Sequence, residues 1–262
     1  AAVVDGVLAE CDGLRVRVEA GPQGGVFAPG APPLRTRRVG LMDHPDPEAA
    51  VEEVVARDLA RPRDLATDDL ATSILFEMGR KELRWYLCAQ HLVLDGYGTI
   101  LLVERVLDQL GQLQGAPGRT RPFGSFRDVV AEDRAYGGSE RRREDRAFWC
   151  EALEGLGPVP GLAAGEPLAG ETCLVERIPL DPELLAGLER VGRAAEAGWP
   201  DVVPVVAALY LARHTGQSEA VLGVTAMNRL GSVAARVPCT TMNVLPLRVL
   251  IDEDEPVAAL AA

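Results

Sequence analysis

The strongest chemical feature of the sequence is a histidine that follows an apolar segment. His91 comes directly after a run that reads as a strand, residues 83–89, and precedes the apolar residues 92–94 and the turn-forming pair Asp95-Gly96. A neutral imidazole can accept a proton near neutral pH, and it can also stabilise charge that develops in a reaction. Because reactive side chains often lie where a strand meets a loop, His91 is a candidate catalytic residue.

His91 also has a structural interpretation, and so do the other two histidines of the chain. Considered alone, a histidine after a strand is more often a hydrogen-bonded structural residue than a catalytic one. His214 ends a helix-like segment, where its charged form is favoured by the helix dipole. His44 lies within Asp43-His44-Pro45-Asp46, which predicts a turn.

The composition excludes several classes of function. The chain has 262 residues and 47% hydrophobic content, enough for one large core or two smaller ones. A formal net charge of −12 disfavours nucleic acid and anionic membranes as partners. No apolar run has the length of a membrane span, and the first residues lack the pattern of a signal peptide. We therefore expect a cytoplasmic protein with no nucleic-acid or membrane partner.

The cysteines do not predict a metal site. They are five, widely spaced, and contain no C-x-x-C pair: Cys11, Cys88, Cys150, Cys173 and Cys239. Metal ligands cluster in characteristic spacings, whereas isolated cysteines usually pack as small apolar residues. We expect no metal site and a packing role for each cysteine.

The elements expected from hydrophobic periodicity and turn residues belong to an α+β fold. Strands are expected at 14–18, 73–78, 83–89, 173–180, 220–224 and 242–251. Helices are expected at 47–60 with Asp46 as N-cap, after Gly96, within 125–153 as one long helix or a broken pair, at 182–197 and at 202–214. The Gly- and Pro-rich segments 21–33 and 156–170 predict a loop and a linker.

Five ordered segments resemble one known family. His91-x-x-x-Asp95-Gly96 is similar to the H-H-x-x-x-D-G signature of nonribosomal peptide synthetase condensation domains, which have a chloramphenicol acetyltransferase-like fold of two lobes with mixed sheets. Four further segments match family motifs in the same order: Arg63-Asp64-Leu65, Asp145 to Trp149, Leu222-Gly223-Val224 followed by Arg229, and Thr241 to Arg248. The resemblance implies an N-terminal lobe at 1–165, which carries the histidine motif, and a partial C-terminal lobe at 166–262.

The resemblance also implies roles for individual residues. His91 takes the place of the family's catalytic histidine, and Gln90 stands where the family has its first histidine, a position we expect to be structural. Asp95 is expected to pair with Arg229 of the other lobe and so to fix the loop that carries His91.

Three more residues of these motifs have expected roles at the site. Gly96 is expected to let the backbone turn tightly where a substrate arm passes. Tyr97 and Asn243 are candidate residues of the substrate cleft.

The implied reaction joins two substrates that are carried on phosphopantetheine arms. An acyl thioester on an upstream peptidyl carrier protein and an aminoacyl amine on a downstream one would form an amide, beside a neighbouring adenylation domain and with no directly bound cofactor. Residues 95–98, 228–232 and 243–246 also resemble condensation domains of siderophore synthetases that accept an aryl starter such as dihydroxybenzoate.

Two other functions remain open for the same fold. One is epimerisation, although the glutamate-bearing segment typical of epimerases is not evident, and the other is a catalytically silent recruitment platform. The chain is also shorter than the family pattern, so we expect an incomplete second lobe.

Overall fold

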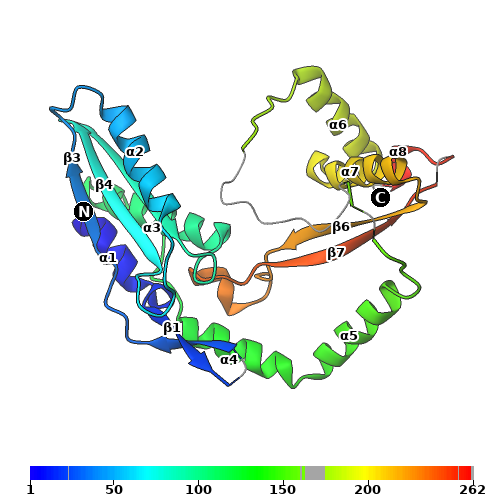
Figure 1. Ribbon diagram of the computed structural model, residues 1–262, viewed down its shortest axis with the longest axis horizontal. Coiled ribbons are helices and arrows are strands. Elements are labelled where there is room, and N and C mark those ends of the chain that lie inside the picture. Colours follow the sequence, from blue (N-terminus) through cyan, green and yellow to red (C-terminus); the bar gives the residue numbers. More distant parts are fainter. Residues whose placement is uncertain (23, 160, 163–174, 253, 261–262) are drawn as a thin grey trace. The chain divides into compact units, whose positions relative to one another are not determined.

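The computed structural model describes the chain except for residues 23, 160, 163–174, 253 and 261–262 (Figure 1). The described residues form two compact units. The first unit contains 1–139 and 227–243, and the second contains 140–226 and 244–262. The expected lobe boundary between residues 165 and 166 lies outside the described residues, so the division into lobes at 1–165 and 166–262 stays a prediction.

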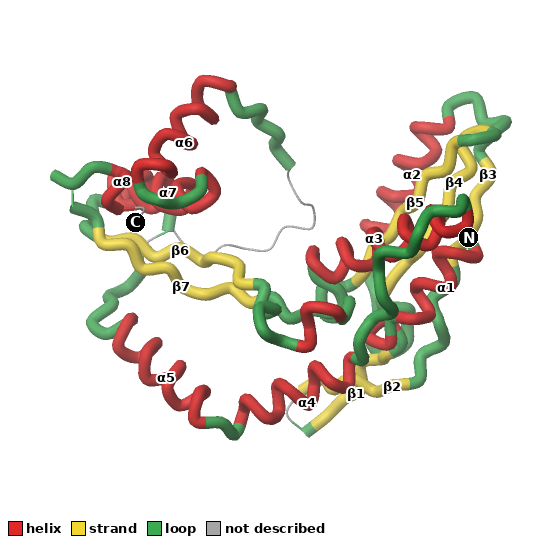
Figure 2. The backbone as a smooth tube through the Cα atoms, turned by 180° about the vertical axis from the view of Figure 1, so that it is seen from behind, coloured by secondary structure: helices red, strands yellow, loops and turns green. Residues whose placement is uncertain are grey.

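A three-stranded sheet forms the centre of the first unit. Its strands are β3 (Thr36–Gly40), β4 (Ala71–Gly79) and β5 (Glu82–Ala89), in the order β3-β4-β5 (Figure 2). β4 and β5 form the expected antiparallel hairpin, whereas β3 lies parallel to β4 and was not predicted. The hairpin brings the chain directly to Gln90 and His91.

Helix α2 (Pro47–Ala60) has the predicted bounds and the predicted N-cap. The Asp46 carboxylate accepts a hydrogen bond from the Ala49 N–H at 3.0 Å, and Pro47 occupies the first turn, where its missing N–H costs nothing. Val51 on α2 packs against Phe76 and Ile74 of β4. Local sequence signals therefore predicted this helix correctly.

Helices α1 (Ala2–Glu10) and α3 (Gly96–Leu113) also belong to the first unit. α3 follows Asp95-Gly96 as expected, whereas α1 was not predicted. An ion pair between Arg105 on α3 and Glu10 on α1, 3.0 Å apart, joins the two helices. The main core of the unit lies among these elements and comprises Val4, Val7, Leu8, Cys11, Leu14, Val16, Leu70, Ala71, Val93, Leu94, Leu102 and Val106.

The turn or loop expected at 21–33 is wrong in part, because residues 24–29 form a strand. β1 (Val16–Gly21) and β2 (Gly24–Pro29) pair as an antiparallel hairpin, preceded by a short 3-10 helix, η1 (Asp12–Leu14). The strand expected at 14–18 is β1, which begins two residues later, at Val16. Glycine and proline predicted a loop, but cross-strand pairing and the contact of Phe27 with Phe126 (ring centroids 6.0 Å apart) favour a strand here.

The charged segment 125–153 forms a broken pair of helices, one of the two forms expected. α4 (Phe126–Gly137) has Gly138 as its C-cap, and α5 (Glu140–Ala152) follows and belongs to the second unit. The Asp12 carboxylate accepts hydrogen bonds from the Ser125 hydroxyl and the Phe126 N–H, both at 2.9 Å. Asp12 therefore fixes the start of α4 within the first unit.

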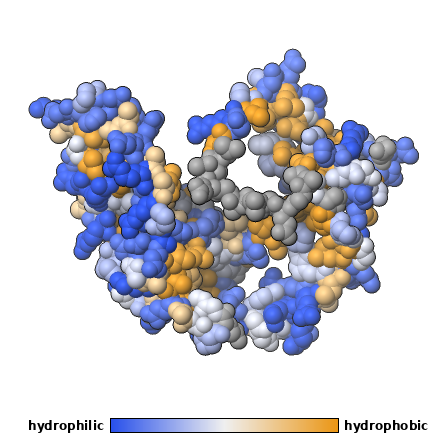
Figure 3. All heavy atoms as spheres, viewed as in Figure 1, coloured by the Kyte–Doolittle hydropathy of each residue, from blue (hydrophilic) through white to orange (hydrophobic). Residues whose placement is uncertain are grey.

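The second unit combines helices with a two-stranded sheet. Besides α5 it contains α6 (Pro182–Ala194), α7 (Trp199–Thr215), β6 (Glu219–Ala226), β7 (Asn243–Leu250) and the short α8 (Val257–Leu260). β6 and β7 pair, and Ala208 of α7 packs against Ala220 and Val249 on these strands. Hydrophobic side chains are exposed over α6 (Figure 3), among them Leu184.

An expected strand and the end of an expected helix in this unit differ from the sequence expectations. Of the strand expected at 173–180, residues 173–174 lie outside the described residues and 175–180 form no strand. The helix expected at 182–197 ends at Ala194, and Glu196 has a φ of 54°, which is incompatible with a continuing helix.

Candidate active site

His91 lies on a turn between β5 and α3. The Gln90 N–H donates to the Leu70 carbonyl at 2.7 Å, and the Val93 N–H donates to the Gln90 carbonyl at 3.0 Å. Val93 and Leu94 are buried in the main core, whereas His91 is exposed. The apolar residues of the motif therefore hold the turn on the core while the imidazole faces outward.

The predicted ion pair between Asp95 and Arg229 is confirmed. Arg229 Nη2 lies 2.9 Å from both carboxylate oxygens of Asp95, and the two side chains are only 3% and 2% exposed. Both residues belong to the first unit. Residues 227–243, which connect β6 to β7 in the sequence, pack in this unit. The pair therefore lies within one unit, rather than joining two.

Three backbone N–H groups also hold the Asp95 carboxylate. Asp95 is the N-cap of α3 and accepts from Gly98 at 2.8 Å, and it accepts from Thr241 at 3.1 Å and Met242 at 3.3 Å. Burial by itself raises the pKa of Asp95, but the Gly98 N–H, the Arg229 guanidinium and the Thr241 N–H together hold this pKa below its usual value. The carboxylate is therefore charged at neutral pH.

Arg229 uses its other N–H groups on backbone carbonyls. Nη1 donates to Ala234, in the short 3-10 helix η2 (Val233–Arg236), and to Val237 at 3.0 Å. Nη2 also donates to Cys239 at 2.7 Å, whereas Nε has no partner among the residues that the structure describes. One buried guanidinium thus joins Asp95 to the whole 229–239 loop.

Tyr97 packs against this guanidinium. The Arg229 Cζ atom lies 4.7 Å from the centroid of the Tyr97 ring, within the range of a cation–π contact, and the Tyr97 hydroxyl donates to the Ala235 carbonyl at 3.3 Å. Asn243 is exposed at the start of β7. The roles of Tyr97 and Asn243 in a substrate cleft stay predictions.

The ion pair between Asp95 and Arg229 is the contact that the sequence motifs predicted. Comparison with known proteins identifies the family. The model of the family described as "Condensation domain" matches residues 28–262. The chain belongs to this family.

Named relatives of this condensation domain are much longer proteins. It is 34% identical over 259 residues to an isonitrile lipopeptide synthase of Streptomyces coeruleorubidus, covering 98% of this chain and 18% of that protein. It is 32% identical over 222 residues to a dimodular nonribosomal peptide synthase of Bacillus subtilis (strain 168), covering 84% of this chain and 9% of that one.

A solved structure supports the predicted fold. The first condensation domain of the CDA synthetase aligns with 99% of this chain and 64% of its own, with a TM-score of 0.80 and 28% identity. The expectation of a chloramphenicol acetyltransferase-like α+β fold is therefore confirmed. The chain spans less than two thirds of that solved chain and less than a fifth of the two relatives.

Gly98, in the first turn of α3, is more closely packed than Gly96. A Cβ atom added to Gly98 would lie 2.8 Å from Leu94 Cδ1 and 3.1 Å from the backbone N and O of Cys239. A Cβ atom on Gly96 would meet nothing within 4 Å, and Gly96 does not have a positive φ. Neither space nor φ therefore demands glycine at position 96, the close approach is two residues later, and the role of Gly96 beside a substrate arm stays a prediction.

Sequence reasoning missed the contacts that Cys239 and Thr240, just before the motif at 241–248, make with the histidine turn. The Asp95 N–H donates to the Cys239 carbonyl at 3.4 Å, and the Thr240 hydroxyl donates to the His91 carbonyl. The motif at 241–248 pointed to this region, but no sequence signal identified the Thr240 contact. Cys239 itself is buried, and burial raises the pKa of its thiol although Arg229 opposes the shift.

The Arg63-Asp64-Leu65 motif supports the sheet behind the site. Arg63 Nη2 lies 3.0 Å from Asp58 at the end of α2, and Tyr86 on β5 donates to the same carboxylate at 2.9 Å. Leu65 packs against the main core. This motif therefore ties α2 to the strand that leads into His91.

The motif that ends at Arg248 has a structural role in the second unit. Arg248 pairs with Glu219 on β6 at 2.8 Å and donates to the Glu154 carbonyl after α5 at 2.9 Å. In the motif Asp145 to Trp149, the Phe148 and Trp149 rings pack edge to face, 5.3 Å apart.

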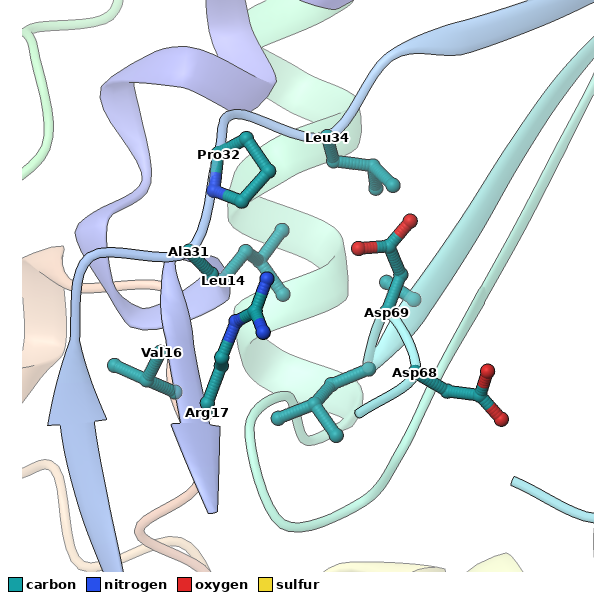
Figure 4. A pocket seen from close by; sticks show the side chains of 10 residues that line it. Leu14, Val16, Arg17, Ala31, Pro32, Leu34, Asp68 and Asp69 are labelled. Carbon is teal, nitrogen blue, oxygen red and sulfur yellow. The ribbon is translucent and has the colours of Figure 1, made fainter. Parts of the chain in front are cut away.

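A small pocket in the first unit does not belong to the candidate site. Figure 4 shows Arg17, Asp68 and Asp69 around it, together with apolar side chains, and none of the candidate residues lines it. Among the described residues, no group of three or more His, Cys, Asp and Glu side chains could hold a metal ion. Within those same residues, no helix has the length and apolar character needed to span a membrane.

Proposed function

We propose that this condensation domain forms an amide bond between two carrier-bound substrates, with His91 as the catalytic residue. The observation that supports the proposal most directly is the contrast between an exposed imidazole and its buried support. The turn that carries His91 is anchored by the core residues Val93 and Leu94 and by the Asp95–Arg229 pair. An accessible imidazole on an anchored turn suits positioning of a reacting amine.

The chemistry needs a nucleophilic amine and a place for its proton. The amine nitrogen of the acceptor attacks the thioester carbonyl carbon of the donor, so that a C–N bond forms and a charged tetrahedral intermediate results. The C–S bond then breaks, the proton lost by nitrogen is returned to sulfur, and the donor arm leaves as a free thiol. An α-amino group has a pKa near 8 and is partly protonated at neutral pH.

The proposed role of His91 is to orient the amine and to stabilise the charged intermediate by hydrogen bonding. Proton acceptance by the neutral imidazole is the second route, and general-base help of this kind contributes ~10²–10⁴ in rate. Gln90 offers hydrogen bonds but no titrating group. The proposal therefore gives the proton-handling role to His91 alone.

The proposed partners are an upstream carrier protein with the donor, a downstream carrier protein with the acceptor, and a neighbouring adenylation domain. The substrates would arrive on phosphopantetheine arms, and the domain itself would bind no resident cofactor. An aryl starter as the donor acyl group belongs to the same proposal and rests on the resemblance of residues 95–98, 228–232 and 243–246.

The proposal is tested by reconstitution with the protein as it occurs in its natural chain. Donor- and acceptor-loaded carrier proteins are mixed with it, and the carrier-bound products are identified by mass spectrometry and chiral analysis. We expect an amide that forms only when both loaded carriers are present. Inversion of the acceptor α-carbon without a donor would indicate an epimerase, and carrier binding without any product would indicate a recruitment platform; either result overturns the proposal.

A further inference from the structure

The segment Cys239–Met242 contacts the histidine motif at three successive points. The Cys239 carbonyl accepts from the Asp95 N–H, the Thr241 and Met242 N–H groups donate to the Asp95 carboxylate, and the Thr240 hydroxyl donates to the His91 carbonyl. All of these residues belong to the first unit. The segment is therefore a second support for the turn, in addition to the Arg229 guanidinium.

Thr240 differs from its neighbours in what it contacts. The other hydrogen bonds between this segment and the histidine motif reach Asp95, four residues after His91, and the segment contributes backbone groups to them. Among the described residues, the Thr240 hydroxyl makes the one side-chain hydrogen bond to a backbone group of His91. The bond falls on the peptide group that joins His91 to Leu92.

The orientation of that peptide group influences the direction of the imidazole. A donor that holds this carbonyl restrains the whole peptide plane, including the His91 Cα atom from which the side chain extends, against rotation and displacement. The turn hydrogen bond from Val93 to the Gln90 carbonyl does not involve the His91 carbonyl, so it leaves this rotation to Thr240. Because both His91 and Leu92 are exposed, core packing does not fix their peptide group either.

We propose that Thr240 is a positioning residue, which orients His91 for catalysis by holding the His91–Leu92 peptide group through its hydroxyl. This inference rests on the proposed function of His91. In this role Thr240 acts through the backbone of His91 rather than on the substrate, so its loss should reduce turnover and leave substrate binding unchanged. A displacement of a catalytic group by about 1 Å can cost ~10²-fold in rate, and we expect a loss of roughly ten-fold or more.

The test compares Thr240→Val, which replaces the hydroxyl by a methyl group of similar size, with Thr240→Ser, which keeps the hydroxyl. The matched control is Thr215→Val, because the Thr215 hydroxyl also donates to a backbone carbonyl, that of Leu211 on α7. Each variant is made in the full natural chain, and kcat, KM for both loaded carriers, the pH profile of kcat and the melting temperature are measured.

We expect kcat to fall about ten-fold or more in Thr240→Val, with KM and melting temperature close to those of the wild type. Thr240→Ser should restore most of kcat, and Thr215→Val should retain it. If Thr240→Val does not fold, Thr240→Ala is compared with Thr240→Ser by the same criteria. Equal kcat in the serine variant and in the variants without a hydroxyl would overturn the inference.

The two proposals fail in different ways. If His91→Ala retains turnover, the proposed function itself is wrong. If His91→Ala is inactive while Thr240→Val turns over like the wild type, the function stands and only the positioning role of Thr240 is refuted. A parallel loss of melting temperature and KM, without serine rescue, would likewise refute the positioning role in favour of general structural support.

Discussion

Replacing Arg229 by methionine should destabilise the protein strongly, because the change leaves a buried carboxylate without its cation. Arg229 contacts both Asp95 oxygens at 2.9 Å and donates to the Ala234, Val237 and Cys239 carbonyls, and its side chain is 3% exposed. Methionine has a similar unbranched shape, so it fills the space without the charge or the donors.

The size of the effect follows from these contacts. Breaking a buried ion pair on one side typically costs ~3–5 kcal/mol, and an unsatisfied buried acceptor costs about 1–3 kcal/mol. The Gly98, Thr241 and Met242 N–H groups continue to hold Asp95 and reduce the penalty. We therefore expect a loss of about 4 kcal/mol, a large part of the ~5–15 kcal/mol by which native proteins are stable.

The assay is urea denaturation at neutral pH of the wild type, Arg229→Met, Asp95→Asn and the double variant. The cost of Arg229→Met should fall by about 2 kcal/mol when residue 95 is the neutral asparagine, because no buried charge is then left unpaired. Arg57→Met serves as the control, since Arg57 pairs with Glu53 at the surface and should cost less than about 1 kcal/mol. A cost below about 1 kcal/mol for Arg229→Met, or no coupling to Asp95, would refute the reasoning.

Three further predictions concern pH and the histidine turn. The folded-state pKa of Asp95 lies below its unfolded value of ~3.9, so the carboxylate stabilises the fold above that pH and loses this contribution as the pH falls through the folded pKa. In acid denaturation the stability of Asp95→Asn should therefore decrease less steeply with pH than that of the wild type. An unchanged slope of stability against pH would contradict this. Gly98→Ala should lower the free energy of unfolding by about 1–3 kcal/mol, because the new Cβ meets Leu94 and Cys239. Gly96→Ala should be neutral or slightly stabilising, because its Cβ meets nothing. Equal melting temperatures of the two variants would refute the distinction. Gln90→His should change the rate of amide formation by no more than about two-fold, far below the ~10²–10⁴ of general-base catalysis. The reason is that Gln90 contacts Leu70 and Val93 through its backbone. A large gain or loss in turnover would assign its side chain a chemical role.

Elements with complete local signals could be predicted from the sequence. α2 was correct because Asp46, Pro47 and the apolar periodicity all specify the same helix, and the β4–β5 hairpin was correct because two apolar strands flank a short turn. β3 was missed because the edge strand carries the charged residues Arg37 and Arg38 and is defined by its parallel pairing with β4, which is distant in sequence.

The candidate site could be predicted only in part from the sequence. Asp95 and Arg229 are 134 residues apart, so their contact was predicted through matching family motifs and not through local patterns. The Thr240 bond to the His91 carbonyl depends on how two loops meet, and the crowding at Gly98 depends on the backbone of Cys239. Neither leaves a signature in residue type or spacing.

The most direct test of the account is amide formation by His91→Ala, measured by mass spectrometry with loaded donor and acceptor carriers. His44→Ala is the matched control, because His44 contacts the backbone of Asp46 beside α2 and has no proposed chemical role. We predict that His91→Ala keeps the wild-type melting temperature and loses at least ~10²-fold in turnover, while His44→Ala remains active. Turnover of His91→Ala within about two-fold of the wild type, with both variants folded, would contradict the assignment of His91 as the catalytic residue.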